Sequence, residues 1–315
     1  MDKDMNYSQI SYDQLKALVE DGIIAFDVPL NEHCSFKIGG PADVFASPKN
    51  QTQFIRLLSF CLENGVPYFI LGKGSNLLIS DKGFRGMAIS TLYYQKLTRD
   101  ENYISAFCGV SLSELCEFAQ QQSLSGLEFA SGIPGTVGGA VFMNAGAYGG
   151  EIKDVLYCSK YIEPNLDSLL SSNPVFHLKA EQHDFSYRHS VFQDRELIHL
   201  SSVFKLQLDD PQAIQKRMDD LNQQRWEKQP MELPSAGSVF RRPPGHFTGK
   251  LIDECGLRGF RLGDAAISEK HCGFIVNLGQ ASAGDVLKLI DHVKSTVMKR
   301  FGVSLETEIR FLGEL

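Results

Sequence analysis

The segment from Ser235 to Pro243 combines a serine hydroxyl with the guanidinium groups of Arg241 and Arg242. Its central serine, Ser238, can donate a proton, and arginine forks bind carboxylate and phosphate groups well. Ser238 lies in no Gly-x-Ser-x-Gly motif and no partner histidine is evident, so the pattern does not favour a hydrolytic nucleophile. Another arginine follows Tyr187 in the run Tyr-Arg-His-Ser-Val-Phe. Taken singly, each arginine is more typical of a surface ion pair than of a functional group.

Two glycine-rich segments could present backbone N–H groups to a ligand. Gly72–Leu78 follows an apolar run and could form an anion nest, but it completes neither a dinucleotide fingerprint nor a Walker loop, and a plain tight turn explains it equally well. Ser131–Gly150 contains seven glycines and almost no charge. We predict that it forms no regular element and lies against a flat ligand such as a flavin ring. A compact structural loop is the alternative.

The C-terminal segment alternates apolar and polar residues from Val303 to Phe311. This period of two predicts one strand with Glu308 and Arg310 on the same face. A solvated sheet face explains the same pattern.

Other patterns predict the elements that must position these residues. Four helices are expected at 11–22, 52–65, from Ser111 onward and at 282–302, the first, third and fourth opened by capping boxes. A polar helix is expected at 211–227. Apolar runs predict strands at 66–71, 87–91, 103–107 and 197–206.

Composition narrows the class of protein. The 315 residues favour two or three domains. Lys and Arg number 31 against 38 Asp and Glu, a formal charge of −7, which argues against a general binder of nucleic acid or anionic membranes. No apolar run approaches a membrane span, and Met1–Asn6 does not resemble a secretory signal, so we predict a cytoplasmic protein. The seven cysteines form no C-x-x-C pair, which favours reduced core thiols and no metal site.

Six motifs occur in one order along the chain and together carry a resemblance. They are Gly72-Lys-Gly-Ser-Asn-Leu-Leu, Ser131-Gly-Ile-Pro-Gly-Thr-Val-Gly-Gly, Asn144-Ala-Gly-Ala-Tyr-Gly, Tyr187-Arg-His-Ser-Val-Phe, Ala236-Gly-Ser-Val-Phe and Leu305-Glu-Thr-Glu-Ile-Arg-Phe. From about Asn31 to Leu312 the chain resembles the UDP-N-acetylenolpyruvoylglucosamine reductase (UDP-N-acetylmuramate dehydrogenase) family, flavoenzymes of bacterial peptidoglycan precursor synthesis.

The resemblance implies an α+β protein. Two FAD-binding subdomains of the vanillyl-alcohol-oxidase (PCMH) type, at 1–78 and 79–208, would precede a third, α+β substrate-binding domain at 209–302, with 303–315 returning near the first. The residues that it places at FAD are Gly72, Lys73, Gly74, Ser75, Asn76, Leu77, Ser131, Gly132, Ile133, Pro134, Gly135, Thr136, Gly138, Gly139, Asn144, Gly146 and Ala147. Gly72–Leu78 contains no histidine or cysteine for covalent attachment, so dissociable FAD is expected.

The family reaction implies roles for three side chains. NADPH, the co-substrate, reduces the flavin, and hydride then passes from flavin N5 to the vinyl carbon of the enolpyruvyl ether. Charge that develops on the adjacent carboxylate needs fixed donors, which suits Arg188. Ser238 matches the general acid by position, and Glu308 matches the glutamate that acts with the arginine on the enolic intermediate. Arg310 is expected at the substrate.

Two departures from the family pattern matter. Many members have Lys-Asn-Pro where this chain has Arg241-Arg242-Pro243, so an asparagine contact to substrate is expected to be either absent or replaced by Arg242. Only 50 positions separate Arg188 from Ser238, which resembles the subclass without a tyrosine-bearing lid loop. Tyr187 is then expected to take part of the role of that lid.

Two alternatives remain open at this stage. One is another flavoenzyme of the same fold, such as a sugar or 2-hydroxy-acid oxidase. The other is a non-catalytic nucleotide-binding or regulatory module that kept the scaffold. The leading hypothesis predicts a sugar-nucleotide substrate, no nucleic-acid partner, no membrane insertion and a monomer.

Overall fold

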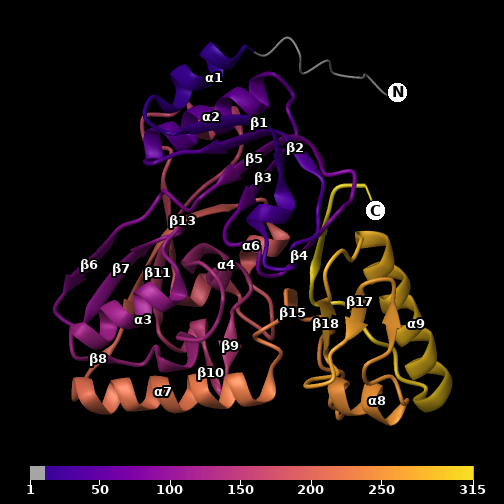
Figure 1. Cartoon of the computed structure of the whole chain (residues 1–315). Helices are drawn as coiled ribbons and strands as arrows, with labels where there is room; N and C mark the ends of the chain where they lie inside the picture. Colours follow the sequence, from indigo (N-terminus) through magenta and orange to yellow (C-terminus); the bar gives the residue numbers. More distant parts are fainter. Residues whose placement is uncertain (1–10, 315) are drawn as a thin grey trace. The chain divides into compact units, whose positions relative to one another are not determined.

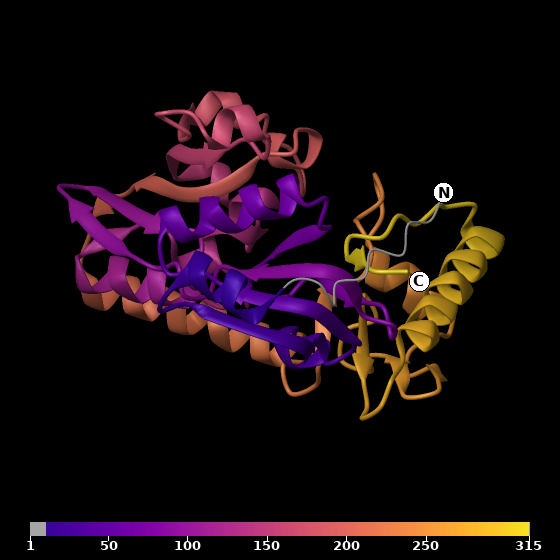
Figure 2. The same ribbon diagram turned by 90° about the horizontal axis from the view of Figure 1, so that it is seen from above.

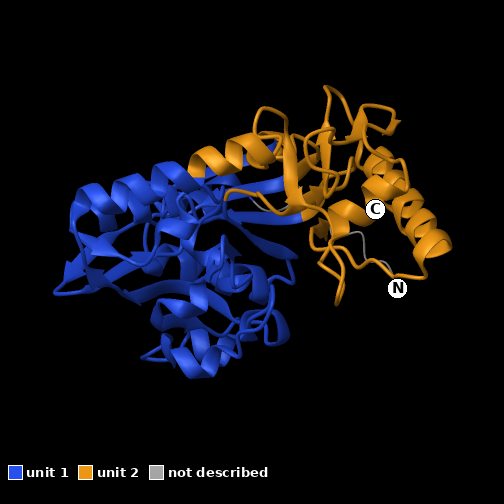
Figure 3. Ribbon diagram, turned by 90° about the horizontal axis from the view of Figure 1, so that it is seen from below, with its two compact units in different colours: residues 1–28, 43–72, 86–221 blue, residues 29–42, 73–85, 222–315 orange. Residues whose placement is uncertain are grey.

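The computed structural model describes residues 11–314, so the expectation for Met1–Asn6 lies outside it. The chain forms two compact units (Figure 3). Unit 1 comprises residues 1–28, 43–72 and 86–221, and unit 2 comprises 29–42, 73–85 and 222–315. The three-domain division stays a prediction.

One part of unit 1 is a small sheet with two helices packed on it (Figure 1). The order of its strands is β1, β2, β5, β3, and β3 and β5 run parallel. The bounds are β1 Ile23–Pro29, β2 Pro41–Ser47, β3 Tyr68–Leu71, β5 Phe84–Ser90, α1 Tyr12–Val19 and α2 Gln51–Glu63. Ser11 and Gln14 form the predicted capping box of α1. Apolar side chains of both helices fill the core beneath them.

The other part of unit 1 is a five-stranded antiparallel sheet in the order β12, β11, β13, β7, β6. Its strands are β6 Leu97–Asp100, β7 Tyr103–Phe107, β11 Leu156–Ile162, β12 Phe176–Lys179 and β13 Ile198–Lys205. The helices are α3 Leu112–Gln121, α5 Leu166–Leu169, α6 Val191–Asp194 and, continuing into unit 2, α7 Pro211–Lys228. Two residue pairs, β8 Leu124–Ser125 and β14 Gln207–Leu208, form a small ribbon. The predicted strands 103–107 and 197–206 and the helix 211–227 are confirmed.

The glycine-rich segment Ser131–Gly150 contains a helix, α4 (Val137–Phe142), so the prediction of no regular element was wrong. Thr136 caps this helix by accepting a bond from the N–H of Gly139. A Cβ at Gly138 would lie 3.0 Å from the Cβ of Cys108. Close packing therefore stabilises a helix that intrinsic propensity disfavours. The segment ends in a two-stranded ribbon, β9 Gly146–Ala147 and β10 Gly150–Glu151.

Unit 2 contains an antiparallel sheet in the order β15, β18, β17, β16. Its elements are β15 Ser235–Ser238, β16 Arg261–Leu262, β17 Ala265–Ile267, β18 Phe274–Asn277, α8 Thr248–Glu254 and α9 Ala283–Phe301. The helix α9 lies along this sheet (Figures 1 and 2). It begins at the predicted capping box of Ser282 and Asp285 and ends at Gly302, which has a φ of 67°.

The C-terminal segment forms a shorter strand than its alternation predicts. Only Arg310–Leu312 is a strand (β19), and it pairs in parallel with β4 (Leu77–Ile79). Leu305 and Ile309 are buried, whereas Phe311 is 43% exposed. The expected continuous strand 303–311 was therefore wrong, because this segment also bonds to the chain near Phe240 and leaves regular pairing.

The α+β fold class is confirmed by this mixture of sheets and helices. Within residues 11–314, no helix is long and apolar enough to cross a membrane. Five cysteines occupy buried positions, as expected of core thiols: Cys34, Cys61, Cys108, Cys116 and Cys272. Burial raises the pKa of Cys61 to about 12, so this thiol stays protonated.

Candidate active site

The first predicted catalytic residue, Arg188, lies in a tight turn of unit 1. Ser186 and His189 exchange both backbone N–H···O bonds, each 3.2 Å long, and leave Tyr187 and Arg188 as the two turn residues. Arg188 has a φ of 57°, a left-handed conformation that costs a side-chain-bearing residue about 1–2 kcal/mol. Such strain at one residue is typical of functional sites.

Side-chain bonds hold this turn against the glycine-rich segment. The guanidinium of Arg188 donates to the carbonyl oxygen of Gly146 at 3.2 Å. The carbonyl of Arg188 itself accepts a bond of 3.0 Å from the amide of Gln193. The guanidinium also lies over the ring of Tyr187, 5.3 Å from its centroid.

Asn144 connects the same two segments and is fully buried. Its amide nitrogen donates to the carboxylate of Glu151 and to the carbonyl of Ser186, both at 3.0 Å. Its oxygen accepts from the N–H of Lys153 at 3.0 Å. The side chain of Asn144 thus forms its hydrogen bonds within the protein. The expected contact of Asn144 with FAD stays a prediction, and we expect it to involve the backbone of this residue.

Glu151 provides a negative charge close to Arg188. Burial raises the pKa of Glu151, but the hydrogen bonds from Lys153 and Asn144 and the charge of Arg188 outweigh burial and lower it. The Nζ of Lys153 lies 2.6 Å from its carboxylate. Glu151 is therefore ionised, and its negative charge lies close to the guanidinium of Arg188.

The two glycine-rich segments meet in unit 1 at Gly72 and Thr136. A Cβ at Gly72 would lie 2.6 Å from the hydroxyl oxygen of Thr136, so only glycine fits there. Next along the chain, in unit 2, Gly74 has a φ of 61°, and a Cβ there would lie 2.5 Å from the carbonyl oxygen of His33. The turn is therefore tightly packed and not a loose connection.

The turn also offers donors suited to the phosphates of FAD. In the described part of the chain, the N–H groups of Lys73, Gly74 and Ser75 donate to no protein acceptor. Gly74 is buried, and a buried donor needs an acceptor. Consecutive free N–H groups in a glycine turn form an anion nest. The residues present thus fit a dinucleotide phosphate.

Ser238 owes its position to a bulge in unit 2. Ser235 pairs with Val276 and Ser238 pairs with Phe274, so β15 carries one residue more than β18 over this stretch. Gly237 takes up the irregularity with a φ of 79°, and a Cβ there would meet no atom within 4 Å. Bulges of this kind redirect side chains next to active sites.

Glu308 lies on the C-terminal segment, which bonds to Val239, the residue that follows Ser238. The N–H of Glu308 donates to the carbonyl of Val239 at 2.8 Å. The amide of Asn76 donates to the carbonyl of Glu308 at 3.3 Å, and the N–H of Arg310 donates to the carbonyl of Asn76 at 2.9 Å. The serine motif, the last motif and the end of the first glycine turn are therefore neighbours.

Positive charge gathers around these residues. Partial burial and the charge of Arg241 lower the pKa of Arg310, so two guanidinium groups lie near each other, an arrangement that an anion stabilises. Arg242 lies over the exposed ring of Phe247, 3.8 Å from its centroid. The family resemblance implied substrate contacts for Arg242 and Arg310, whereas the sequence indicated Arg241 only as a second guanidinium beside Ser238.

His271 is a neighbour of Ser238 that no sequence motif indicated. A Cβ at Gly273 would lie 3.2 Å from the hydroxyl oxygen of Ser238 and 2.9 Å from Cε1 of His271. The N–H of Gly273 donates to Nδ1 of His271 at 3.1 Å. Burial lowers the pKa of His271, which favours its neutral form. A lone histidine has no spacing signal that could have predicted this.

The predicted site residues divide between the two units. Unit 1 holds Gly72, Ser131, Gly132, Ile133, Pro134, Gly135, Thr136, Gly138, Gly139, Asn144, Gly146, Ala147, Tyr187 and Arg188. Unit 2 holds Lys73, Gly74, Ser75, Asn76, Leu77, Ser238, Arg242, Glu308 and Arg310. The structure brings residues together within each group. That Arg188 meets Ser238 and Glu308 around one substrate stays a prediction.

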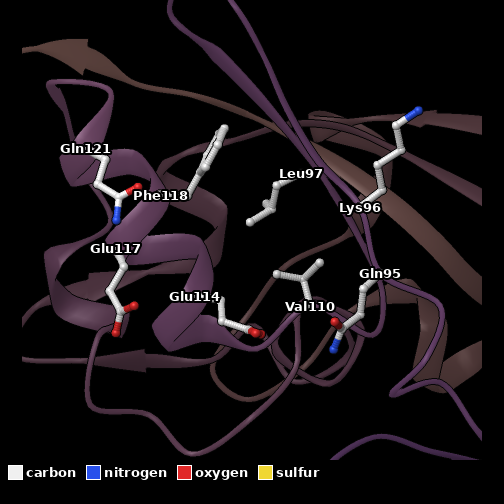
Figure 4. Close-up of a pocket in the computed structure, with 8 residues that line it drawn as sticks. All are labelled: Gln95, Lys96, Leu97, Val110, Glu114, Glu117, Phe118 and Gln121. Atoms are coloured by element: carbon white, nitrogen blue, oxygen red, sulfur yellow. The ribbon is translucent and has the colours of Figure 1, made fainter.

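A pocket of about 320 Å³ lies elsewhere, beside α3 in unit 1. Figure 4 shows Leu97, Val110 and Phe118 around this space, with polar side chains at its edge. One of these, the carboxylate of Glu114, already accepts bonds from Ser111 in the capping box of α3. None of the predicted site residues lines it. In residues 11–314 no group of three metal-ligating side chains is found.

Comparison with known proteins gives consistent matches. Residues 229–312 match the C-terminal domain of UDP-N-acetylenolpyruvoylglucosamine reductases, and residues 42–164 match an FAD-binding domain. The reductase of Caldanaerobacter subterraneus is 44% identical over 98% of this chain and 99% of its own. That of Clostridium botulinum is 45% identical over 96% of each. The crystal structure of the Thermus caldophilus reductase, 33% identical, matches with a TM-score of 0.75 over 93% of this chain and 99% of that one.

These matches confirm the FAD-binding fold and FAD as the cofactor. They identify the protein as an FAD-dependent oxidoreductase. The matches cover 99% of the Caldanaerobacter reductase and 99% of the Thermus reductase. The chain therefore belongs to the UDP-N-acetylenolpyruvoylglucosamine reductase family.

Proposed function

We propose that the protein reduces UDP-N-acetylenolpyruvoylglucosamine to UDP-N-acetylmuramate with NADPH, a step of peptidoglycan precursor synthesis in the cytoplasm. The observation that carries this proposal is the adjacency of Ser238 and Glu308 on bonded segments that also meet the first glycine turn. The names of the relatives supply the substrate.

Bound FAD would supply the hydride-transfer chemistry that links the nicotinamide to the vinyl carbon of the substrate. The N–H groups of Lys73, Gly74 and Ser75, within the predicted Gly72–Leu77 turn, would hold its phosphates, and the segment Ser131–Ala147 would lie against its ring. Gly72–Leu78 contains neither histidine nor cysteine, so the cofactor is held without a covalent bond.

Arg188 would stabilise the charge that develops on the carboxylate of the enolpyruvyl group. Its guanidinium is fixed before substrate arrives by the bond to Gly146 and by its position in the turn. A donor fixed in this way needs no reorganisation as charge develops, and this is the main source of electrostatic catalysis.

Ser238 would donate a proton to the carbon next to that carboxylate. Glu308, on the adjacent segment, would act with Arg188 on the enolic intermediate. Arg310 and Arg242 would bind anionic groups of the substrate, with Arg242 in place of the usual asparagine. The exposed ring of Tyr187 would cover part of the substrate in a subclass without the tyrosine lid loop.

The test is an assay of the purified protein loaded with FAD. A yellow solution with an absorbance band at about 450 nm is expected. NADPH alone should reduce the bound flavin once, and continued NADPH oxidation should require UDP-N-acetylenolpyruvoylglucosamine. Oxygen consumption with a hydroxylated substrate would instead identify an oxidase. A protein that cannot be loaded with FAD would be a non-catalytic module. Size-exclusion chromatography checks the expected monomer.

A further inference from the structure

The amide nitrogen of Gln193, in the short helix α6, donates to two carbonyl oxygens and also lies 3.9 Å from the sulfur of Met143. Its Nε2 lies 2.8 Å from the carbonyl oxygen of Phe142 and 3.0 Å from the carbonyl oxygen of Arg188. Phe142 is the last residue of α4, in the glycine-rich segment. One side chain thus joins the end of that helix to the arginine turn.

Ser190 supports Gln193 through two further hydrogen bonds. Its backbone N–H donates to the carbonyl of Ser190 at 2.9 Å, and the hydroxyl of Ser190 donates to the same Phe142 carbonyl at 2.8 Å. Carbonyl groups at the end of a helix lack intrahelical partners, so these two side chains satisfy an acceptor of α4. Of these two side chains, Gln193 extends the connection to the carbonyl of Arg188.

The connection matters because the proposed function requires Arg188 to stay at a constant distance from the bound flavin. The guanidinium already touches the glycine-rich segment at Gly146. The position of the guanidinium, however, also depends on the position of the backbone that carries its flexible side chain. A displacement of a reacting or binding group by about 1 Å can slow a reaction about 100-fold.

We propose that Gln193 is a positioning residue that holds the backbone of Arg188 at a fixed place relative to the flavin-contacting segment. The inference rests on the proposed function, since it assumes that Arg188 acts on the substrate. It requires the two N–H donors of the amide, because both partners are carbonyl oxygens.

The experiment compares three variants with the wild type. Gln193→Met keeps the length of the side chain and removes both donors. Gln193→Lys keeps donors on a side chain of similar reach. Gln121→Met is the control, because Gln121 is exposed on α3 and its side chain makes no hydrogen bond to the described chain.

The first measurement needs no substrate. Hydrogen exchange of the Ser186 and His189 amides, which close the arginine turn, should be at least about 10-fold faster in Gln193→Met. Gln193→Lys and Gln121→Met should exchange like the wild type. Equal protection in Gln193→Met would show that the clamp does not hold the turn and would overturn the inference.

The second measurement separates the two half-reactions of the loaded enzyme in single turnovers. In Gln193→Met, NADPH should reduce the flavin within about twofold of the wild-type rate, whereas reoxidation by the enolpyruvyl sugar nucleotide should slow about 10- to 100-fold. Gln193→Lys should stay within about threefold of the wild type, because its donors are retained.

The outcomes separate the positioning role of Gln193 from the proposed function of the protein. Unchanged reoxidation in Gln193→Met, with faster exchange of the turn amides, overturns the positioning role. An equal fall in the reoxidation rate of Gln193→Met and Gln193→Lys also overturns this role. A fall that does not depend on the N–H donors would come from altered packing. A wild-type enzyme that the sugar nucleotide fails to reoxidise refutes the proposed function, while hydrogen exchange still reports on the clamp itself.

Discussion

The Arg188 turn in unit 1 and the Ser238 bulge in unit 2 both use a left-handed residue to direct a side chain, but they place that residue differently. In the turn, Arg188 itself has a φ of 57°. In the bulge, the neighbouring Gly237 has a φ of 79°, and Ser238 is free of the strain. Glycine adopts this conformation at no steric cost, whereas arginine does not.

The difference indicates what each side chain needs from its backbone. A serine hydroxyl reaches little beyond its Cα, so a bulge one residue away is enough to redirect it. The guanidinium of Arg188 must both point at a substrate and remain fixed. Bonds from Gln193 to its carbonyl and from its own guanidinium to Gly146 offset the strain at the functional residue itself. Three predictions test this comparison.

The largest effect is expected where strain and function coincide. Arg188→Asn and Arg188→Ala should both lower kcat about 10²- to 10³-fold, because each removes a fixed donor. Asparagine tolerates the left-handed conformation better than alanine, so Arg188→Asn should be more stable than Arg188→Ala by about 1 kcal/mol. Urea unfolding and steady-state kinetics measure the two quantities. Equal stability of the variants would show that the turn relaxes and that no strain is stored.

Acid is expected to weaken unit 1 through the residues that support the arginine turn. Buried His183 shortly precedes the turn, and a chain of side-chain bonds of 2.8, 2.7 and 2.7 Å runs from it through Ser159 and Ser202 to His199. Burial and the neighbouring His183 lower the pKa of His199 to about 3. Burial also lowers the pKa of His183.

The sign follows from proton binding. An unfolded histidine binds a proton below about pH 6.5, whereas folded His199 resists it until about pH 3. Its contribution to stability is therefore complete above pH 6.5 and is lost as the pH falls, at up to about 1.4 kcal/mol per pH unit. Between pH 7 and 5 the apoprotein should lose about 2 kcal/mol more than His199→Gln in urea unfolding. Identical pH profiles would contradict this.

The smallest effect concerns the bulge. Gly237→Ala should lower the unfolding free energy by about 1–2 kcal/mol, because alanine must adopt the left-handed conformation. Gly256→Ala is the matched control, since Gly256 has a φ of 74° and equally open space around it. Both variants should lose similar stability, but only Gly237→Ala should lose turnover. Full activity in Gly237→Ala would mean that the bulge does not aim Ser238.

Local signals predicted the elements that form within a few residues. Capping boxes at Ser11, Ser111 and Ser282 predicted the starts of three helices, and each box is present. The helix α4 was not predicted, because close packing of Gly138 on Cys108 and the cap at Thr136 offset the low helix propensity of glycine. The packing contact joins residues that lie far apart in the sequence, Gly138 and Cys108.

The candidate site shows the same division. Motif resemblance supplied Ser238, Arg188 and Glu308, and the structure places two of these on adjacent segments. Arg241 was considered only for its guanidinium, and His271 and Gln193 were not predicted at all, because only the folded chain brings their neighbours close to them. The side chain of Asn144 turned out to bond within the protein, which its place in a glycine-rich motif does not indicate.

The central claim is that Ser238 donates a proton to a substrate reduced by the flavin. Single-turnover kinetics of Ser238→Ala test it most directly, with FAD bound. NADPH should reduce the flavin at the wild-type rate, because Ser238 plays no part in that step. Reoxidation by UDP-N-acetylenolpyruvoylglucosamine should then slow about 10²- to 10⁴-fold. Reoxidation at the wild-type rate would contradict the account.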